Sequence, residues 1–196
     1  MRGLAQVQDT NVVVEILRKR LDLEASGSEL YLPFLLSFTD PGYRLSLMKL
    51  VAGEVEHSYR LYLVLTSLGV EGRRIAEDGF NKRSRFSRVL DVRPESKEEA
   101  LVHAFITRIV SLAHLEQVRA TLEPLSSQLN LPLIEKQERL QLTWLENVIS
   151  GTNLNLRHTL LKYHHLAEEL ARDLGLSGES TAKVMEKLND VLGSIP

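Results

Sequence analysis

Apolar residues recur along this chain at steps of three and four residues rather than in strict alternation. That spacing places apolar side chains on one face of an α-helix, whereas a half-buried strand alternates at every second residue. No segment combines a run of β-branched residues with the turn residues that bound a hairpin. The pattern therefore predicts an all-α protein.

Capping residues, prolines and glycines divide this pattern into helices. The expected helices run from Thr10 or Asn11 past Leu35, from Pro41 to Leu68, from Ser96 to Pro124, from Pro132 to about Gly151, from Leu156 to Leu174, and from a cap at Ser180 or Thr181 onward. Residues 71–95 are polar and predict a long crossover, with the basic residues between Lys82 and Arg88 in solvent. Four long helices in two antiparallel pairs joined by a crossover are the topology of a ferritin-like four-helix bundle. We expect one domain over residues 1–196, with the last helices as additions.

The second expected helix carries an ionisable pair in the middle of its apolar face. Its inward positions are Leu47, Leu50, Glu54, His57, Leu61, Val64 and Leu68. A carboxylate and an imidazole at core positions are costly unless they are paired or bind a cation. Glu-x-x-His puts both side chains on one helix face, where they can ligate one metal ion of a site in the bundle core.

The first expected helix repeats this anomaly. Leu17 and Leu21 lead to Glu24 on the same apolar stripe. Antiparallel packing about the turn at Asp40 and Pro41 brings Glu24 near the level of Glu54. The first helix pair is therefore typical of half of a dimetal carboxylate site.

The second helix pair departs from that pattern. Arg108 occupies the central inward position of the third helix, where a carboxylate is expected. The fourth helix carries Glu138-x-x-Gln141, in which an amide replaces the expected imidazole. If the register of this helix differs by one turn, Glu135 takes the place of Glu138. A guanidinium repels metal cations, and an amide is a poor iron ligand.

Short motifs resemble a known family. Leu50-Val51-Ala52-Gly53-Glu54-Val55-Glu56-His57, followed by Tyr62 and Thr66-Ser67-Leu68-Gly69-Val70, is similar to the second helix of the phenylacetic acid catabolic protein family, which includes subunits of phenylacetyl-CoA epoxidase. Trp144-Leu145-Glu146 with Gly151-Thr152 resembles the end of the fourth helix in a structural subunit of that complex. The resemblance implies a ferritin-like fold with Glu24, Glu54, His57 and Glu138 at ligand positions, and Arg108 and Gln141 depart from it.

Composition excludes several functional classes. The 24 basic and 26 acidic residues of this 196-residue chain give a net charge of −2, which is no footprint for nucleic acid. The absence of cysteine excludes disulfides and thiolate sites. No apolar stretch approaches the roughly 20 residues that span a bilayer, and the first residues do not resemble a signal peptide. We expect a cytoplasmic protein that forms a homo-oligomer or a complex with related helical subunits.

Two main hypotheses remain. In the first, Arg108 bridges Glu24, Glu54 or Glu138, the metal site is incomplete, no cofactor is bound, and the protein has a structural or partner-binding role. In the second, it is a non-haem diiron oxygenase or oxidase acting on a small aromatic or acyl-CoA substrate. A third, weaker hypothesis is a site for a single metal ion at Glu54 and His57. His103 and His114 do not share the inward positions of Arg108, and we expect them to be peripheral.

Overall fold

The computed structural model of the protein describes residues 10–75, 85–151 and 156–195. Within these ranges the regular elements are helical and none is a strand, which confirms the all-α prediction. The α-helices are α1 (Thr10–Tyr31), α2 (Pro41–Ser67), α4 (Lys97–Leu122), α5 (Ser126–Leu129), α6 (Leu131–Gly151), α7 (Leu156–Leu174) and α8 (Gly178–Ser194). Short 3-10 turns lie at Leu32–Phe34, Arg88–Asp91 and Glu123–Leu125.

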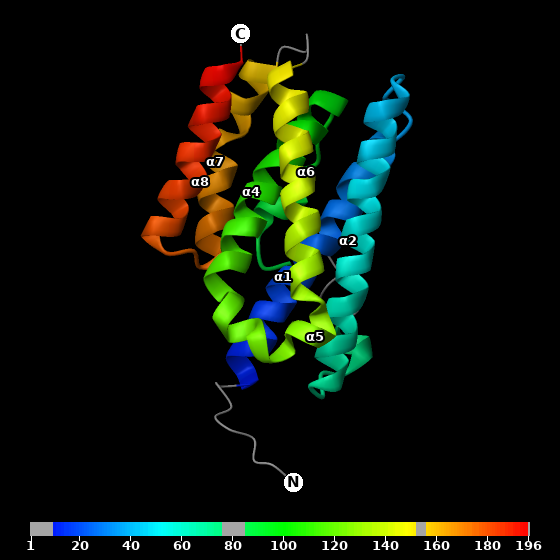
Figure 1. Cartoon of the computed structure of the whole chain (residues 1–196), viewed down its shortest axis with the longest axis vertical. Coiled ribbons are helices and arrows are strands. Elements are labelled where there is room, and N and C mark those ends of the chain that lie inside the picture. Colours follow the sequence, from blue (N-terminus) through cyan, green and yellow to red (C-terminus); the bar gives the residue numbers. More distant parts are fainter. Residues whose placement is uncertain (1–9, 76–84, 152–155, 196) are drawn as a thin grey trace.

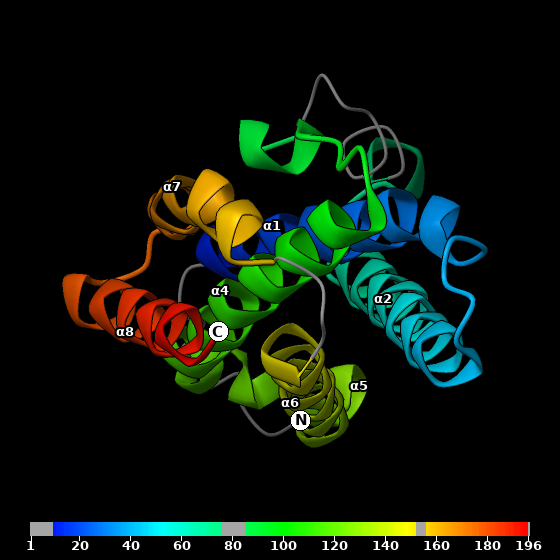
Figure 2. The ribbon, with the colours of Figure 1, turned by 90° about the horizontal axis from the view of Figure 1, so that it is seen from above.

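The long helices run roughly along one axis (Figure 1). With the chain's start at the bottom, α1 runs upward, α2 and α4 run downward, and α6 runs upward. The helices α7 and α8 then form a further antiparallel pair. Seen from above, this pair covers the side of the bundle away from α2, and α4 lies between the two sides (Figure 2). The central position of α4 explains why it is apolar nearly all round, and its residues 100–112 are all buried.

The buried apolar side chains form two clusters rather than one. On α2 the first cluster includes Leu47 and Leu50, and the second includes Leu61 and Leu65. On α6 the second cluster includes Ile134, and the first begins again at Leu142. The residues between these levels, Glu54 and His57 on α2 and Glu138 on α6, are buried and polar. A polar level therefore separates two apolar halves of the core.

Several predicted helix ends are confirmed. The Asp40 carboxylate accepts a hydrogen bond from the Tyr43 N–H at 2.9 Å and caps α2. Ser96 caps α4 by accepting from the Glu99 N–H at 3.1 Å. The helix α7 has the predicted limits, Leu156–Leu174.

Other ends differ from the prediction. The first helix stops at Tyr31 and continues as a 3-10 turn, because Pro33 has no N–H to bond within an α-helix. The segment from Ser126 to Leu129, expected as a loop, is the short helix α5. The last helix begins three residues early, because Ser177 rather than Ser180 caps it.

The crossover between α2 and α4 is anchored by a basic residue that we expected in solvent. The Arg85 side chain is buried and donates to the Leu90 carbonyl at 2.6 Å and to Glu29 at 2.5 Å. It also lies 3.8 Å from Asp22 on α1. The solvent-exposed interpretation was wrong for Arg85, and Lys82 and Arg83 lie outside the described residues.

Within the described ranges, no helix is both long enough and apolar enough to cross a lipid bilayer.

Truncating a core side chain tests the packing. Leu50 is fully buried in the first apolar cluster, whereas Leu36 is 83% exposed. We expect Leu50→Ala to lower the unfolding free energy by about 3 kcal/mol, since it removes buried methyl groups and leaves a cavity. Leu36→Ala is the control, with a change within about 0.5 kcal/mol in the same urea titration. Equal effects at the two sites would contradict this packing.

Candidate functional site

Six buried ionisable side chains meet at the polar level of the bundle, and we call them the ionic layer. They are Arg20 and Glu24 on α1, Glu54 and His57 on α2, Arg108 on α4, and Glu138 on α6. Each follows or precedes apolar inward residues at helical spacing, so the core-facing stripe of its helix carries it inward. None is more than 4% exposed. Four helices thus contribute charged side chains to one buried level of the bundle core.

Arg108 lies between two carboxylates. Its Nη2 pairs with Glu54 Oε1, and its Nη1 lies 3.6 Å from Glu138 Oε1. The structure therefore brings Arg108 to Glu54 and Glu138, but its direct partners do not include Glu24. A guanidinium suits this position because it is always charged and presents several N–H donors in a plane.

Arg20 is a second buried guanidinium, and sequence reasoning missed it. Its Nη2 donates to Glu24 Oε1 at 3.0 Å and to Glu138 Oε1 at 2.6 Å. Its Nη1 donates to the Ser111 carbonyl at 3.1 Å. The available signal was spacing, since Arg20 is three residues after Leu17 and four before Glu24, on the flank of the same stripe.

His57 connects the layer to the bundle surface. Its Nδ1 lies 3.1 Å from Glu24 Oε2, and its Nε2 lies 2.8 Å from Gln137 Oε1. The Gln137 side chain also hydrogen-bonds Glu56, so its N–H₂ faces that carboxylate and its oxygen faces His57. Both ring nitrogens then meet acceptors, which requires a proton on each. His57 is therefore an imidazolium that donates at both positions.

Electrostatics agree with this assignment. Burial alone would lower the pKa of His57, but the Glu24 carboxylate and the hydrogen bond that His57 donates to Gln137 outweigh it and raise the pKa to about 9. Burial likewise would raise the pKa of Glu24, yet His57, Arg108 and Arg20 together hold it below its usual range. Each glutamate of the layer pairs with a cation, so that three carboxylates face two guanidiniums and one imidazolium. The ionic layer is balanced in charge.

A small residue on α1 makes room for Glu54. A Cβ at Gly27 would lie 2.8 Å from Glu54 Oε2, which is closer than real Cβ contacts. Any side chain at this position would push the carboxylate away from α1. Gly27 lies inside the continuous helix α1, so its role is this close approach rather than a break in the helix.

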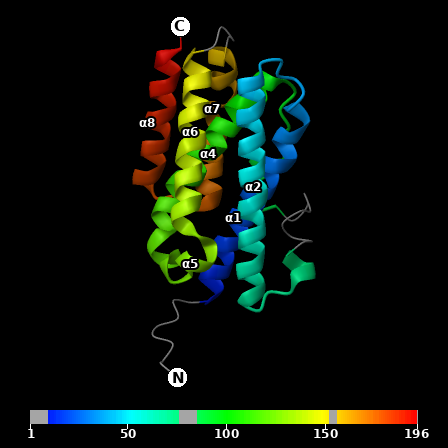
Figure 3. The same ribbon diagram turned by 45° about the vertical axis from the view of Figure 1, so that its right-hand side comes forward.

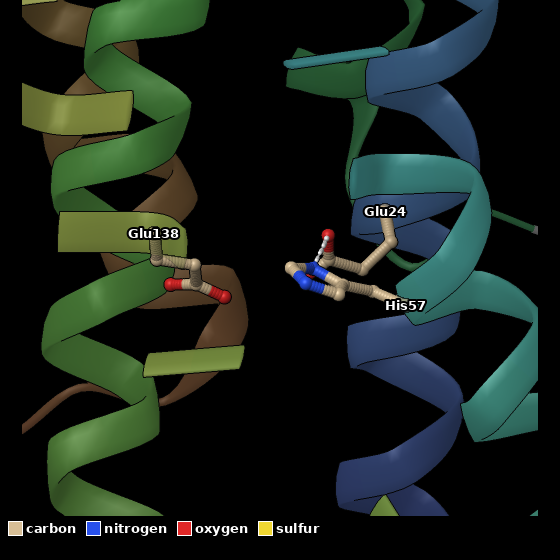
Figure 4. A group of neighbouring side chains, drawn as sticks. All are labelled: Glu24, His57 and Glu138. Carbon is tan, nitrogen blue, oxygen red and sulfur yellow. Dashed lines mark hydrogen bonds and ion pairs between the residues drawn. The ribbon is translucent and has the colours of Figure 1, made fainter. Parts of the chain in front are cut away.

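Three members of the layer could together offer ligand atoms to one metal ion. One ligand atom from each of Glu24, His57 and Glu138 lies within 4.8 Å of the other two. Figure 4 shows Glu24 and His57 together on one side, with Glu138 facing them from α6. However, Arg20 already joins Glu24 to Glu138, and Arg108 joins Glu54 to Glu138. The glutamates and His57 therefore do not fit a dimetal centre. The carboxylates are already paired with two permanently charged guanidiniums, and the imidazole carries a proton on each nitrogen.

The burial of the glutamates on α6 decides which of them faces the core. Glu138 is fully buried, whereas Glu135 pairs with Arg119 at 2.9 Å and Arg139 at 3.0 Å on the outside. Glu138, rather than the alternative Glu135, faces the core. The structure does not bring Gln141 into the ionic layer, and Gln137, one turn earlier, is the amide that reaches His57.

A groove lies between α2 and α6, directly outside the layer. Its volume is about 520 Å³, and its lining includes Lys49, Glu56, Gln137, Gln141 and Trp144. A Cβ at Gly53 would lie 2.7 Å from Gln141 Nε2, so the missing side chain lets this amide lie against α2. Gln137, which lines this groove, also bonds His57.

His103 and His114 are buried, so our expectation that they are peripheral was wrong. Both lie near residues of α1: His103 meets Tyr31, and His114 lies near Arg20 and Lys19. Tyr31 Oη lies 3.1 Å from His103 Nδ1. Burial lowers the pKa of His103 to about 4 and, together with Arg20 and Lys19, that of His114 to about 3. Both are neutral at pH 7.

Comparison with known proteins adds no relative. No protein-family profile matches the chain, and no curated protein sequence is significantly similar to it. The resemblance to the phenylacetic acid catabolic protein family therefore depends on the motifs around Glu54 and Trp144 alone.

Removing Arg108 tests whether the layer holds buried charge. Arg108→Ala leaves Glu54 buried without its counter-ion, and we expect a loss of about 3–5 kcal/mol in unfolding free energy. Arg139→Ala is the control, because Arg139 makes only exposed ion pairs and its loss costs less than about 1 kcal/mol. The two variants are compared by urea unfolding. A change below about 0.5 kcal/mol at Arg108 would refute the buried pairing.

The raised pKa of His57 predicts a pH dependence. Between pH 6.5 and about pH 9 the folded chain keeps a proton that the unfolded chain releases. The stabilisation from His57 is therefore complete below pH 6.5 and is lost as the pH rises through about 9. We expect the difference in unfolding free energy between the wild type and His57→Gln to shrink across this window. Exposed His165→Gln is the control and should leave the slope unchanged. A pH-independent difference for His57→Gln would show that His57 is not protonated in the fold.

Proposed function

We propose that this chain is a ferritin-like bundle, related to the phenylacetic acid catabolic protein family, in which the ionic layer stands where a dimetal centre would lie. Its role is then structural or partner-binding rather than catalytic. The observation that carries this proposal is the pairing of Arg20 and Arg108 with all three carboxylates of the ionic layer. The up, down, down, up order of α1, α2, α4 and α6 supports the ferritin-like topology (Figure 1).

The charge balance explains why the layer disfavours metal. A divalent cation added to a neutral buried layer leaves an excess of positive charge in a region of low dielectric constant. Metal binding at His57 would also have to remove its proton, and the guanidiniums cannot lose theirs. The layer instead fixes how the four helices align, because sliding a helix by one turn would move a charge into an apolar cluster.

A partner is part of this proposal. We expect the chain to work in the cytoplasm as a homo-oligomer or in a complex with related helical subunits.

A second candidate function is metal-dependent oxidation of a small aromatic or acyl-CoA substrate. Two observations favour it. The ligand atoms of Glu24, His57 and Glu138 lie close enough to hold one ion, and Gln137, which bonds His57, lines the groove between α2 and α6. This function requires Arg20 to leave its two carboxylates, so the metal content of the protein separates the two candidates.

Elemental analysis is the test. Protein from cells supplied with iron and manganese should contain less than about 0.1 metal ion per chain, since the layer is already balanced. Its thermal midpoint should be the same with and without EDTA, because a ligand that binds the folded state would otherwise stabilise it. His57→Ala and Glu138→Gln should leave the metal content unchanged.

About two irons per chain, lost in both variants, together with an absorption change on exposure to dioxygen, would overturn the structural role and establish the second candidate.

A further inference from the structure

The outer face of α2 carries an apolar stripe that nothing in the described part of the chain covers. Half of the large apolar side chains that are exposed in the described ranges lie on this one helix. They are Leu45, Met48, Val55, Tyr59 and Leu63. The helix α2 stands at the edge of the bundle, with α1 and α6 behind it (Figures 2 and 3). An exposed apolar stripe on such an edge marks an interaction surface.

The spacing of the stripe defines the kind of partner. Leu63 lies one residue beside the regular pattern. The exposed residues Leu45, Met48, Ala52, Val55, Tyr59 and Thr66, with half-buried Tyr62, which also packs against the second apolar cluster, step by three and four residues over three heptads. We call these residues the outer seam. It is displaced by two residues, or about 200° of rotation, from the inward stripe of α2. It extends for about 30 Å at 1.5 Å per residue. A heptad seam of this length packs against another helix by knobs-into-holes contacts.

We propose that the outer seam pairs with the same seam of a second copy of this chain, with the two α2 helices antiparallel. This inference rests on the partner-binding part of the proposed function, and it uses residues outside the ionic layer.

Side-chain size favours this pairing. Antiparallel packing centred between Gly53 and Glu54 places Ala52 against Val55 of the second copy. Met48 then faces Tyr59, and Leu45 faces Tyr62. A small residue meets a branched one at the centre, and a flexible thioether meets an aromatic ring on either side. The seam is therefore complementary to itself under a two-fold axis.

Charge favours the antiparallel orientation. Lys49 and Glu56 flank the seam on the same side, one heptad apart, and both also line the groove toward α6. Antiparallel pairing brings Lys49 near Glu56 of the second copy, and the two-fold axis makes this contact twice. Parallel pairing would instead place Arg44 beside Lys49 of the second copy, which is a repulsive contact.

The apolar surface also extends from the seam across the groove to α6. Leu140 is exposed there, and half-buried Trp144 lines the groove wall. The apolar surface open to the second copy therefore includes residues of α6 as well as the outer seam of α2.

Sedimentation equilibrium measures the dissociation constant of the dimer, and variants show which residues the dimer needs. We expect the wild type to be a dimer at micromolar concentration. Val55→Glu places two carboxylates near the two-fold axis and should raise the dissociation constant at least about 100-fold. Leu161→Glu is the matched control, because Leu161 on α7 is 53% exposed and Val55 is 55% exposed. The control should remain a dimer, and equal dissociation by both variants would overturn the assignment of the seam.

Charge reversal tests the orientation. Lys49→Glu should weaken the dimer about tenfold, since it places two carboxylates together at each of the two contacts. Adding Glu56→Lys to the same chain should restore the affinity to within about threefold of the wild type. Failure of this second change to restore the dimer would exclude the antiparallel arrangement.

Cross-linking gives an independent answer, because the chain has no natural cysteine. A mixture of Met48→Cys and Tyr59→Cys chains should form a disulfide between the two variants. Met48→Cys alone should not cross-link, because its two copies would lie about 16 Å apart along the axis. Cross-linking of Met48→Cys with itself would show a parallel pair. A monomer with no cross-link would overturn the proposal and leave the outer seam to a different partner.

These outcomes are separable from those for the ionic layer. A metal-free monomer would overturn the dimer and leave the ionic layer as proposed. A dimer with about two irons per chain would overturn the structural role and leave the α2 interface intact.

Discussion

A charge inside a protein must lie at hydrogen-bonding distance from an opposite charge, and four helices of this bundle meet that condition at one level. Glu138 from α6 accepts from Arg20 of α1 and faces Arg108 of α4, while Glu54 of α2 pairs with the same Arg108. No two of these helices can shift relative to each other without separating an ion pair. The ionic layer thus sets the alignment that the two apolar clusters, being non-directional, leave open.

The layer is organised around guanidiniums in the way that other bundles are organised around metal ions. A guanidinium contacts two carboxylates at once, as Arg20 contacts Glu24 and Glu138, and so it links helices as a bridging cation does. It differs in that it is covalently part of the chain and cannot be removed by a chelator. Stability and metal supply are therefore independent in the structural role that we propose, whereas they would be linked in a metalloenzyme.

Much of the fold was predictable because the signals are local. The inward stripes of α1, α2 and α4 are read from spacing alone, and the caps at Asp40 and Ser96 are set by neighbours within three residues. The carboxylates and imidazole of the site were found in the same way.

What escaped prediction depends on distant partners. Arg20 lies on the flank of its stripe, and besides Glu24 on its own helix it reaches Glu138, more than a hundred residues away. Arg85 is held by Glu29 and Asp22 of α1, while His103 meets Tyr31 of α1 and His114 lies near Arg20 and Lys19 of the same helix. Helical spacing carries no information about such contacts. The amide that reaches His57 is Gln137, a position that a one-turn uncertainty in α6 was enough to hide.

Charge neutrality of the ionic layer also limits how this sequence can diverge. Replacing one acidic member by an apolar residue leaves a surplus positive charge in the core, and replacing one basic member leaves a surplus negative charge. Viable descendants must therefore change two members together, one of each sign, and either member changed alone passes through a destabilised intermediate. In this sense the six members of the layer, His57 included, form one electrostatic unit, and a charge lost from it is compensated only by the loss of a charge of the opposite sign.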